Sequence, residues 1–269
     1  MKVALFPNYE RQGTQELLSK IVQILASLNI DCYTEESKTE QGKDLYEYCD
    51  VIITIGGDGT LIKHAKEAAK YGKHCIGVNT GNLGFLANVD KDTIELLEKL
   101  KTGDYLTESR MMLEVTATKN GKVLYSGMAL NDAVVSSERV ARIADIKLGV
   151  SGDEIAYRAD GVIVSTPTGS TAYSMSAGGP IIDPAVRCLT VTPVCSHSLT
   201  ARPMILSEST EIDIAVQNTS RTTAILSVDG QRCAEVDFDT TVSLKKSDFV
   251  ARFINLTGST IYKTVSKKF

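Results

Sequence analysis

The chain has 269 residues, of which 43% are hydrophobic and 23% are charged. These proportions are typical of globular proteins and exclude a disordered or fibrous chain. The 33 acidic residues outnumber the 29 basic ones, and the net charge of −4 offers no long-range attraction for the phosphates of a nucleic acid. We therefore expect no nucleic acid partner, and the length indicates one or two domains, with two as the working number.

The six cysteines are widely spaced and form no C-x-x-C pair of the kind that binds zinc, so we interpret them as buried free thiols in a reducing cytosol. The three histidines show no metal-ligand spacing, and no residue is assigned as a metal ligand. The apolar run at residues 1–6 is too short for a signal peptide, and no apolar run reaches the length of a membrane span. The sequence predicts a cytoplasmic protein with no membrane partner.

The first part of the chain alternates between strand-like and helix-like segments. Strands are predicted at residues 3–6, 51–55 and 75–78, and helices at residues 16–28, 61–70 and 91–100. Alternation of this kind implies a parallel sheet with helices on both faces. We predict a Rossmann-like parallel α/β domain over residues 1–105, on which a tail from about residue 250 to 269 could pack.

Short β-branched runs separated by Gly, Asn, Asp and Ser follow from about residue 106. The runs lie at residues 113–117, 123–125, 143–148, 162–165, 212–216, 224–228, 241–244 and 247–256. This spacing, with turn candidates at Asn120-Gly121 and at residues 151–153, is typical of an all-β sandwich. We predict a C-terminal β-sandwich domain over residues 106–249.

Three glycines follow the predicted strand at residues 51–55, in the run Gly56-Gly57-Asp58-Gly59-Thr60. Glycine lets backbone N–H groups come close to a ligand, and the start of the following helix favours an anion. A tight turn with a capping Asp58 or Thr60 is the alternative. A turn needs only one or two glycines, however, and a carboxylate in an anion-binding loop repels phosphate unless it accepts a proton or holds a metal. We therefore interpret the run as a phosphate loop in which Asp58 has a chemical role.

This loop differs from the P-loop pattern and from the G-x-G-x-x-G fingerprint. It resembles the GGDGT signature that NAD kinases share with diacylglycerol and sphingosine kinases and, in near form, with phosphofructokinases. The run at residues 77–86 resembles a glycine-rich segment of NAD kinases and lacks the GTGND-like segment expected in diacylglycerol kinases. The resemblance to the NAD kinase family covers nearly the whole chain and is weaker at residues 7–49 and after Ser207.

The most specific segment is Arg158-Ala159-Asp160-Gly161 with the strand and the run of Ser, Thr, Gly, Ala and Pro that follow, up to Pro180. The run offers hydroxyls and backbone groups suited to a sugar and a base edge. Tyr173 supplies a flat face that could stack on a purine or on nicotinamide. An arbitrary run of this composition would be a polar surface loop. The near-continuous match to the NAD kinase family favours a binding function here.

The pair Asn131-Asp132 taken alone is a turn, but it resembles the pair that NAD kinases place against the adenosine moiety. The resemblance implies a set of nucleotide contacts in this chain. The assignments are weakest for Lys63, Arg142, Cys195 and Gln231, for which a solvated surface residue is the alternative. The implied contacts are at Gly56, Gly57, Gly59, Thr60, Lys63, Asn131, Asp132, Arg142, Arg158, Asp160, Thr171, Ala172, Tyr173, Ser174, Met175, Ser176, Cys195 and Gln231.

The resemblance implies a phosphotransferase with an alcohol group as acceptor. Asp58 is the candidate catalytic base, taking the proton of the adenosine ribose 2′-hydroxyl of NAD. The glycine loop, together with Mg²⁺ or another divalent cation, would hold the phosphates of ATP. The dinucleotide is expected where the two domains meet. A homo-oligomer (dimer or tetramer) is also expected, with Arg158 and Asp160 acting across its interface.

Two other functions stay open at this point. A lipid kinase of the diacylglycerol type would need a hydrophobic substrate cleft, and the polar run at residues 165–176 argues against it. A non-catalytic dinucleotide sensor would keep the pocket without turnover, and the presence of Asp58 argues against that. The sequence leaves the donor open between ATP, another triphosphate and polyphosphate, and it does not decide whether NADH is accepted.

Overall fold

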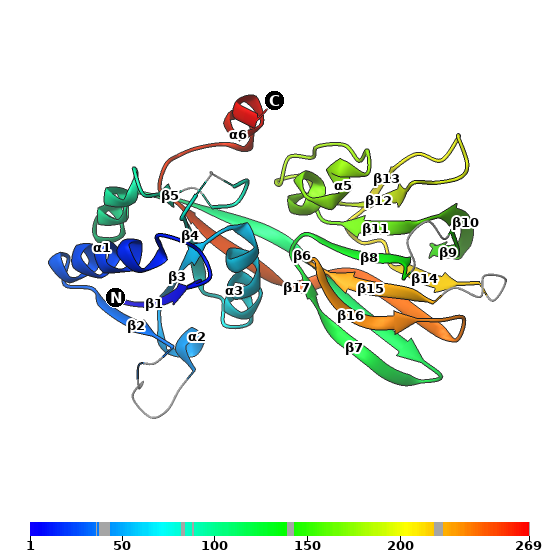
Figure 1. The fold of residues 1–269 in the computed structure, drawn as a ribbon, viewed down its shortest axis with the longest axis horizontal. Coiled ribbons are helices and arrows are strands. Elements are labelled where there is room, and N and C mark those ends of the chain that lie inside the picture. The colour runs from blue at the N-terminus through cyan, green and yellow to red at the C-terminus, as the bar shows by residue number, and fades with distance from the viewer. Residues whose placement is uncertain are drawn as a thin grey trace. The chain divides into compact units, whose positions relative to one another are not determined.

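The computed structural model describes residues 1–35, 37, 44–81, 84–87, 89–138, 143–217 and 223–268. The chain forms two compact units (Figure 1). Unit 1 comprises Met1–Arg110 and Phe249–Phe269, and unit 2 is Met111–Asp248. Each of the long strands β6 (Leu106–Lys119) and β17 (Thr240–Asn255) contributes residues to both units.

Unit 1 is built on a parallel sheet with the order β2, β1, β3, β4, to which the end of β17 and the short β5 add along β4. Strand β3 is buried along its whole length, which explains why its sequence is a continuous apolar run. The predicted Rossmann-like α/β fold is confirmed. The strands are β1 (Lys2–Pro7), β2 (Asp31–Thr34), β3 (Val51–Gly56), β4 (His74–Asn79) and β5 (Val89–Asp90).

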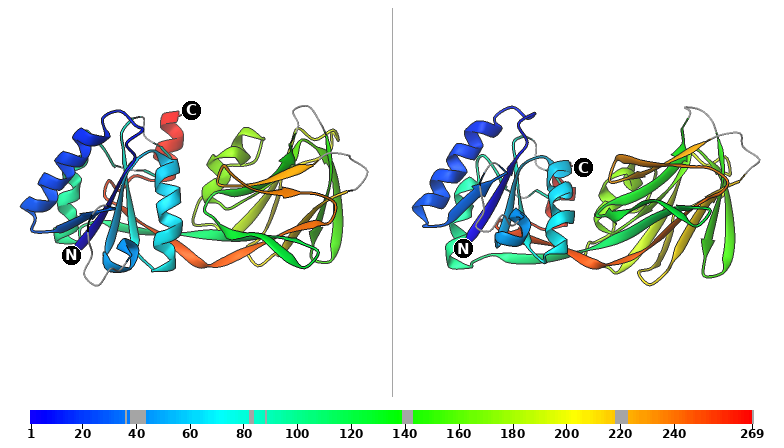
Figure 2. Two further views of the ribbon diagram at one scale, coloured as in Figure 1. Left: turned by 60° about the horizontal axis from the view of Figure 1, so that its bottom comes forward. Right: turned by 90° about the horizontal axis from the view of Figure 1, so that it is seen from below.

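Helices cover both faces of this sheet (Figure 2). Leu17 and Ile21 of α1 and Leu97 of η2 share one core with β1, β3 and β4. Helix α3 lies on the opposite face, where Leu61 packs so closely on Gly77 of β4 that a Cβ atom there would lie 2.6 Å from it. The helices are α1 (Thr14–Ser27), α2 (Leu45–Tyr48), α3 (Asp58–Lys70), the 3-10 helix η2 (Ile94–Glu98), α4 (Lys99–Thr102) and α6 (Ile261–Lys268).

The prediction of one continuous helix over residues 91–100 is wrong in its first part. The N–H of Asp90 donates to Thr93 Oγ1 at 3.0 Å, and Thr93 Oγ1 donates to Asp90 Oδ1 at 2.8 Å. Such local side-chain bonds compete with helical ones, so the helix begins only at Ile94 and its first segment is 3-10.

The tail, whose placement the sequence left open, ends in α6 and belongs to unit 1.

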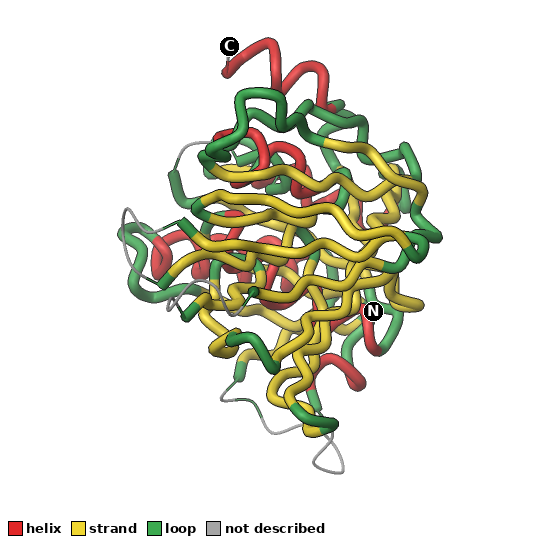
Figure 3. The backbone as a smooth tube through the Cα atoms, turned by 90° about the vertical axis from the view of Figure 1, so that its right-hand side faces the viewer, coloured by secondary structure: helices red, strands yellow, loops and turns green. Residues whose placement is uncertain are grey.

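Unit 2 contains two groups of antiparallel strands around one core. The first is a six-stranded sheet in the order β13, β12, β11, β8, β15, β16, whose strands lie side by side in Figure 3. In the second, β10 pairs with β9, β9 with β14, and β14 with the first part of β17, while β6 pairs with β7. Val135 and Val164 from the first group and Ile146 and Ile214 from the second share the core. The predicted β-sandwich is confirmed.

The elements of unit 2 are short, apart from the two long strands. The runs predicted at residues 212–216 and 224–228 coincide with β14 and β15. Those predicted at residues 241–244 and 247–256 belong to the single strand β17, which ends at Asn255. Among the described residues, no helix combines the length and the apolarity that crossing a membrane requires. The remaining elements are β7 (Lys122–Ala129), β8 (Asp132–Ser137), β9 (Ala144–Val150), β10 (Asp153–Ala159), β11 (Gly161–Ser165), η3 (Thr168–Thr171), α5 (Tyr173–Ser176), β12 (Cys188–Val194), β13 (Met204–Ser207), β14 (Ile212–Val216), β15 (Ala224–Val228) and β16 (Gln231–Val236).

Candidate functional site

Asp58 is the first residue of α3 and its carboxylate is held by backbone N–H groups from another part of unit 1. Phe85 N at 2.8 Å and Leu86 N at 3.4 Å donate to Oδ2, and Ala87 N donates to Oδ1 at 3.0 Å. An ionised carboxylate offers about four acceptor positions, so one remains for a further donor such as a hydroxyl. The two glycine-rich segments of the sequence therefore meet at this single carboxylate.

Gly84 approaches the same carboxylate closely. A Cβ atom on Gly84 would lie 2.0 Å from Oδ1 and 2.4 Å from both Cγ and Oδ2 of Asp58. Any other residue at this position would displace the carboxylate, which makes Gly84 part of the site. The sequence offered only a weak signal for it, the density of glycines in residues 77–86. Residues 82 and 83 of that segment lie outside the described residues.

The glycines before and after Asp58 serve different purposes. A Cβ on Gly56 would lie 2.7 Å from Thr60 Oγ1, which accepts a hydrogen bond from Asn8 Nδ2 at 3.2 Å, so Gly56 is required by packing. A Cβ on Gly59 would meet nothing within 4 Å, so this position is open. The first N–H groups of a helix lack partners within the helix, and its N-terminus favours an anion. An anion can therefore approach the start of α3 at Gly59, and the exposed Lys63 follows one turn later.

His64 lies on the buried side of α3. Its Nδ1 is 2.6 Å from the hydroxyl of Tyr46, and its ring stacks on that of Phe6 at a centroid distance of 4.2 Å. Burial, with a smaller effect from the charge of Lys63, lowers the pKa of His64 to about 4. His64 is therefore neutral at physiological pH and supports the helix behind the phosphate loop.

In unit 2, Asp229 organises the turn that carries Asn131 and Asp132. Its Oδ1 accepts from Asn131 N at 2.8 Å and from Asp132 N at 3.3 Å, and its Oδ2 accepts from Leu130 N at 3.0 Å. Asp229 and Gly230 have φ angles of 47° and 77°, and they join β15 to β16. Positive φ at both central residues is what a tight hairpin needs. Asp229 was not among the predicted site residues, although an Asp-Gly pair between two strand-like runs is a known hairpin signal.

Asp132 is a buried carboxylate. The residue is only 4% exposed. Burial, together with the charge of Asp229, raises the pKa of Asp132 to about 7. Close to neutral pH this group can therefore be either a protonated donor or an ionised acceptor.

A pocket of about 420 Å³ in unit 2 contains four of the predicted contact residues. Asn131, Asp132, Ala172 and Tyr173 line it, and Tyr173 is 47% exposed. A concave site of this size that combines an aromatic face with a few polar groups is suited to a small organic ligand. The other lining residues are Val134, Ser136, Ser227, Asp229 and Gly230.

The run of small polar residues after β11 is folded into η3 and α5, and several of its hydroxyls are used internally. Thr166 Oγ1 donates to Leu130 O at 2.6 Å, Ser170 Oγ donates to Pro167 O at 2.6 Å, and the hydroxyls of Ser174 and Thr192 are 2.9 Å apart. The expectation that these hydroxyls face a ligand thus needs correction for Ser174, which is fully buried. Its hydroxyl holds the segment in place.

Gly169 brings this segment against the Asn131 turn. A Cβ on Gly169 would lie 2.1 Å from the carbonyl oxygen of Asn131, and Thr166 N donates to the same oxygen at 2.9 Å. The close packing fixes Ala172 and Tyr173 relative to Asn131. Thr171, Ala172 and Met175 are half-buried, and Ser176 is exposed.

The other predicted contacts in unit 2 do not line this pocket as far as the structure describes them. Arg158 on β10 is exposed and forms an ion pair with Asp145 at 3.1 Å, and Asp160 is half-buried between β10 and β11. Cys195, with φ 47°, is exposed after β12, and Gln231 is exposed at the start of β16. Arg142 lies outside the described residues.

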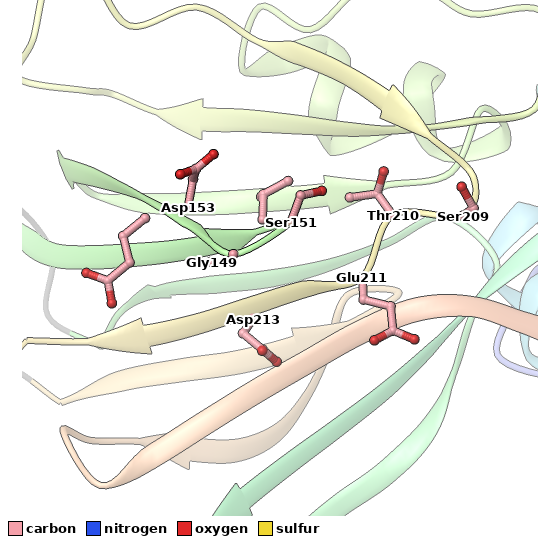
Figure 4. Close-up of a pocket in the computed structure, with 10 residues that line it drawn as sticks. Gly149, Ser151, Asp153, Ser209, Thr210, Glu211 and Asp213 are labelled. Atoms are coloured by element: carbon pink, nitrogen blue, oxygen red, sulfur yellow. The ribbon is translucent and has the colours of Figure 1, made fainter.

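A second pocket, of about 430 Å³, lies between the β9–β10 turn and the segment before β14 (Figure 4). Its carboxylates include those of Glu154 and Asp213, which have local partners. Lys147 Nζ lies 2.8 Å from Glu154, and Ser243 Oγ donates to Asp213 at 2.6 Å. None of the predicted contact residues lines this pocket, and we assign no function to it.

The fold and the site define a class of protein, the nucleotide-dependent kinases that carry a carboxylate within a glycine-rich phosphate loop. The family model for the ATP-NAD kinase N-terminal domain matches residues 11–105, and the model for the ATP-NAD kinase C-terminal domain matches residues 130–256. The chain is 34% identical to an NAD kinase of Natranaerobius thermophilus over 99% of this chain and 96% of that relative. It is 41% identical to an NAD kinase of Symbiobacterium thermophilum over 81% of this chain and 78% of that relative. The chain therefore belongs to the ATP-NAD kinase family, as its motifs indicated.

Solved structures agree with this assignment. An NAD kinase from Archaeoglobus fulgidus, crystallised in complex with ATP, superimposes with a TM-score of 0.77 at 27% identity, covering 100% of this chain and 98% of that one. Yeast NADH kinase complexed with NADH gives a TM-score of 0.84 over 99% of this chain and 85% of that one. Its identity of 22% supports the fold alone.

Proposed function

We propose that the protein transfers the terminal phosphoryl group of ATP to the 2′-hydroxyl of the adenosine ribose of NAD, giving NADP. The observation that carries this proposal is the Asp58 carboxylate at the start of α3, fixed by three backbone N–H groups with one acceptor position left over. Membership of the ATP-NAD kinase family supports the choice of substrates.

In this proposal Asp58 is the general base. The 2′-hydroxyl donates to the remaining acceptor position and gives its proton to the carboxylate as its oxygen attacks the γ-phosphorus. The bond from the γ-phosphorus to the β,γ-bridging oxygen breaks, and ADP leaves. Phosphoryl transfer depends mainly on positioning and charge neutralisation. The open backbone at Gly59 and the start of α3 would hold the donor phosphates.

A divalent cation, Mg²⁺ or another, would accompany the triphosphate. Among the described residues there is no group of three or more His, Cys, Asp or Glu side chains that could hold a metal ion by themselves. Mg²⁺ is commonly bound by one or two carboxylates together with substrate phosphates and water. The residues present fit a cation carried mainly by the donor, with Asp58 as the nearest carboxylate of the loop. When bound, the cation would neutralise phosphate charge.

For the dinucleotide we propose the unit 2 pocket as the place where a base and its ribose are recognised. The exposed ring of Tyr173 would stack on a base, and Asn131 and Asp132 would hydrogen-bond polar edges of the nucleoside. The other contacts that stay proposals are Lys63, Arg142, Arg158, Asp160, Thr171, Met175, Ser176, Cys195 and Gln231.

We also propose a cytoplasmic location and a homo-oligomer, dimer or tetramer, in which Arg158 and Asp160 act across an interface. All six cysteines are free thiols, which is consistent with a reducing compartment. The expectation that they are buried holds for Cys49, Cys75 and Cys188 and is wrong for the exposed Cys195 and the half-buried Cys32 and Cys233. The Arg158 side chain is 67% exposed and so is available to a neighbouring subunit. Sedimentation of a fully active monomer would contradict the role across an interface.

One assay separates the candidate functions. The protein is incubated with NAD, ATP and Mg²⁺, and NADP is measured with an NADP-specific dehydrogenase. Formation of NADP supports the proposal. Phosphorylation of an acylglycerol instead would identify a lipid kinase, and binding of NAD without turnover would identify a sensor. Replacing ATP by GTP or by polyphosphate, and NAD by NADH, then determines the donor and the acceptor.

A further inference from the structure

The connection between β1 and α1 (residues 8–13) forms hydrogen bonds at both ends of the glycine run at residues 56–60. The N–H of Asn8 donates to Ile55 O at 2.8 Å, at the end of β3, and its Nδ2 donates to Thr60 Oγ1 at 3.2 Å, in α3. Its carbonyl oxygen accepts from Thr14 Oγ1 at 2.8 Å and from Arg11 N at 3.1 Å. The connection is therefore a fixed part of the phosphate loop's surroundings.

This connection places Arg11 beside Gly57. The guanidinium Nη2 lies 3.3 Å, and Cζ 3.6 Å, from the point that a Cβ atom on Gly57 would occupy. Arg11 is exposed, so its guanidinium can be reached by a ligand. An exposed arginine thus lies beside the backbone at the start of α3.

The charge of the loop and its donor favours a cation at this place. The glycine run itself contributes only a negative charge, that of Asp58, and the donor phosphates add more. The exposed Lys63 is one turn further along α3. A guanidinium offers a planar fork of donors that matches phosphate oxygens, and it stays charged at every relevant pH.

We propose that Arg11 binds the phosphates of the phosphoryl donor at the glycine run. This inference rests on the proposed function, to which it adds a residue that neither the motifs nor the family resemblance assigned. Because the guanidinium contacts phosphate and not the base, Arg11 serves ATP, GTP and inorganic tripolyphosphate alike. It therefore contributes to the affinity for a polyanionic donor, and the choice of base must come from other residues.

The test compares the wild type with Arg11→Gln, Arg11→Lys and the control Lys101→Gln, which removes one exposed positive charge from α4. Initial rates are measured against donor concentration at saturating NAD, and against NAD at saturating ATP. Losing a charge-assisted contact to phosphate should lower kcat/KM for ATP about 10- to 100-fold in Arg11→Gln, while KM for NAD stays unchanged. The same factor is expected with GTP and with tripolyphosphate wherever the wild type uses them. Arg11→Lys should lose less, and Lys101→Gln nothing.

Two results would overturn the inference while the proposed function stands. One is an unchanged kcat/KM for ATP in Arg11→Gln when the wild type forms NADP. The other is an equal loss for ATP and NAD together with a lower melting temperature, which would mean a structural role. If the wild type forms no NADP with any donor, the proposed function fails, and calorimetric titration with ATP tests Arg11 by itself. Weaker ATP binding in Arg11→Gln than in the wild type then supports the inference, and equal or absent binding overturns it.

Discussion

Replacing Gly84 by alanine is the sharpest perturbation that the structure offers. The new methyl carbon would lie 2.0 Å from Oδ1 of Asp58, whereas ordinary van der Waals contact begins at 3.4 Å. The carboxylate must therefore move by more than about 1 Å, or the 84–87 segment must move away from it. Either movement breaks hydrogen bonds from Phe85 and Ala87, which now measure 2.8 and 3.0 Å.

The expected cost has two parts. A displacement of about 1 Å in a catalytic group typically costs about 100-fold, so kcat for NADP formation should fall by that factor or more. Losing bonds between backbone N–H groups and a charged carboxylate should also reduce the free energy of unfolding by roughly 1–3 kcal/mol. The second effect is measured by urea unfolding, and the first by initial rates at saturating NAD and ATP.

Gly81 in the same segment provides the matched control. A Cβ on Gly81 meets nothing within 4 Å, so Gly81→Ala should leave kcat within a small factor of the wild-type value. If Gly84→Ala retained wild-type turnover at saturating substrates, the position of the Asp58 carboxylate would not limit catalysis. The assignment of Asp58 as the base would then be refuted. If both alanine variants lost activity equally, the effect would come from losing any glycine of this segment and not from the collision with Asp58.

Three further predictions concern Asp58, Tyr173 and Asp132. Asp58→Asn should lower kcat about 10²–10⁴-fold with little change in the affinity for NAD, and wild-type turnover would contradict the role of base. Tyr173→Ala should raise the Kd for NAD about 10-fold, as expected for the loss of one stacked base, whereas Tyr173→Phe should not; calorimetric titration distinguishes the two. The pKa of Asp132 is raised from its ordinary value of 3.8 to about 7, so the folded state binds more protons than the unfolded state between these values. Its contribution to the free energy of unfolding therefore falls as the pH rises from about 4 to about 7, by at most about 4 kcal/mol. Asp132→Asn should remove this decline, and an unchanged difference between urea unfolding curves at pH 5 and pH 8 would count against it.

Local patterns in the sequence were sufficient for much of the fold. The apolar run at residues 51–55, the glycines after it and the helical spacing at residues 61–70 predicted β3 and α3 because strand and helix periodicities extend over only a few neighbouring residues. The runs at residues 212–216 and 224–228 gave β14 and β15 for the same reason. The start of η2 was missed because an Asp–Thr side-chain network replaced helical hydrogen bonds there.

The prediction of a phosphate loop also came from neighbouring residues, since Asp58 adjoins the glycines of its loop in the chain. The partners that complete the site are distant. Phe85 is 27 positions from the Asp58 that it binds, and Leu130 is 99 positions from Asp229. Without homologous sequences, no local pattern reveals which distant N–H groups will face a given carboxylate. That pairing follows from the parallel register of β3 and β4 and from the antiparallel register of β8 and β15.

Local patterns were therefore sufficient for the fold class and for the phosphate loop with its single carboxylate, and the resemblance indicated the family. The residues that surround those motifs could be identified only in the folded chain. In the folded chain Gly84 lies against Asp58, and Arg11 lies beside Gly57. Asp229 accepts a hydrogen bond from Asn131 N, and the hydroxyl of Ser174 is hydrogen-bonded to that of Thr192. A motif consists of residues that are neighbours in the sequence. Hydrogen bonds, steric collisions and burial depend instead on distances between atoms that come close only when the chain folds.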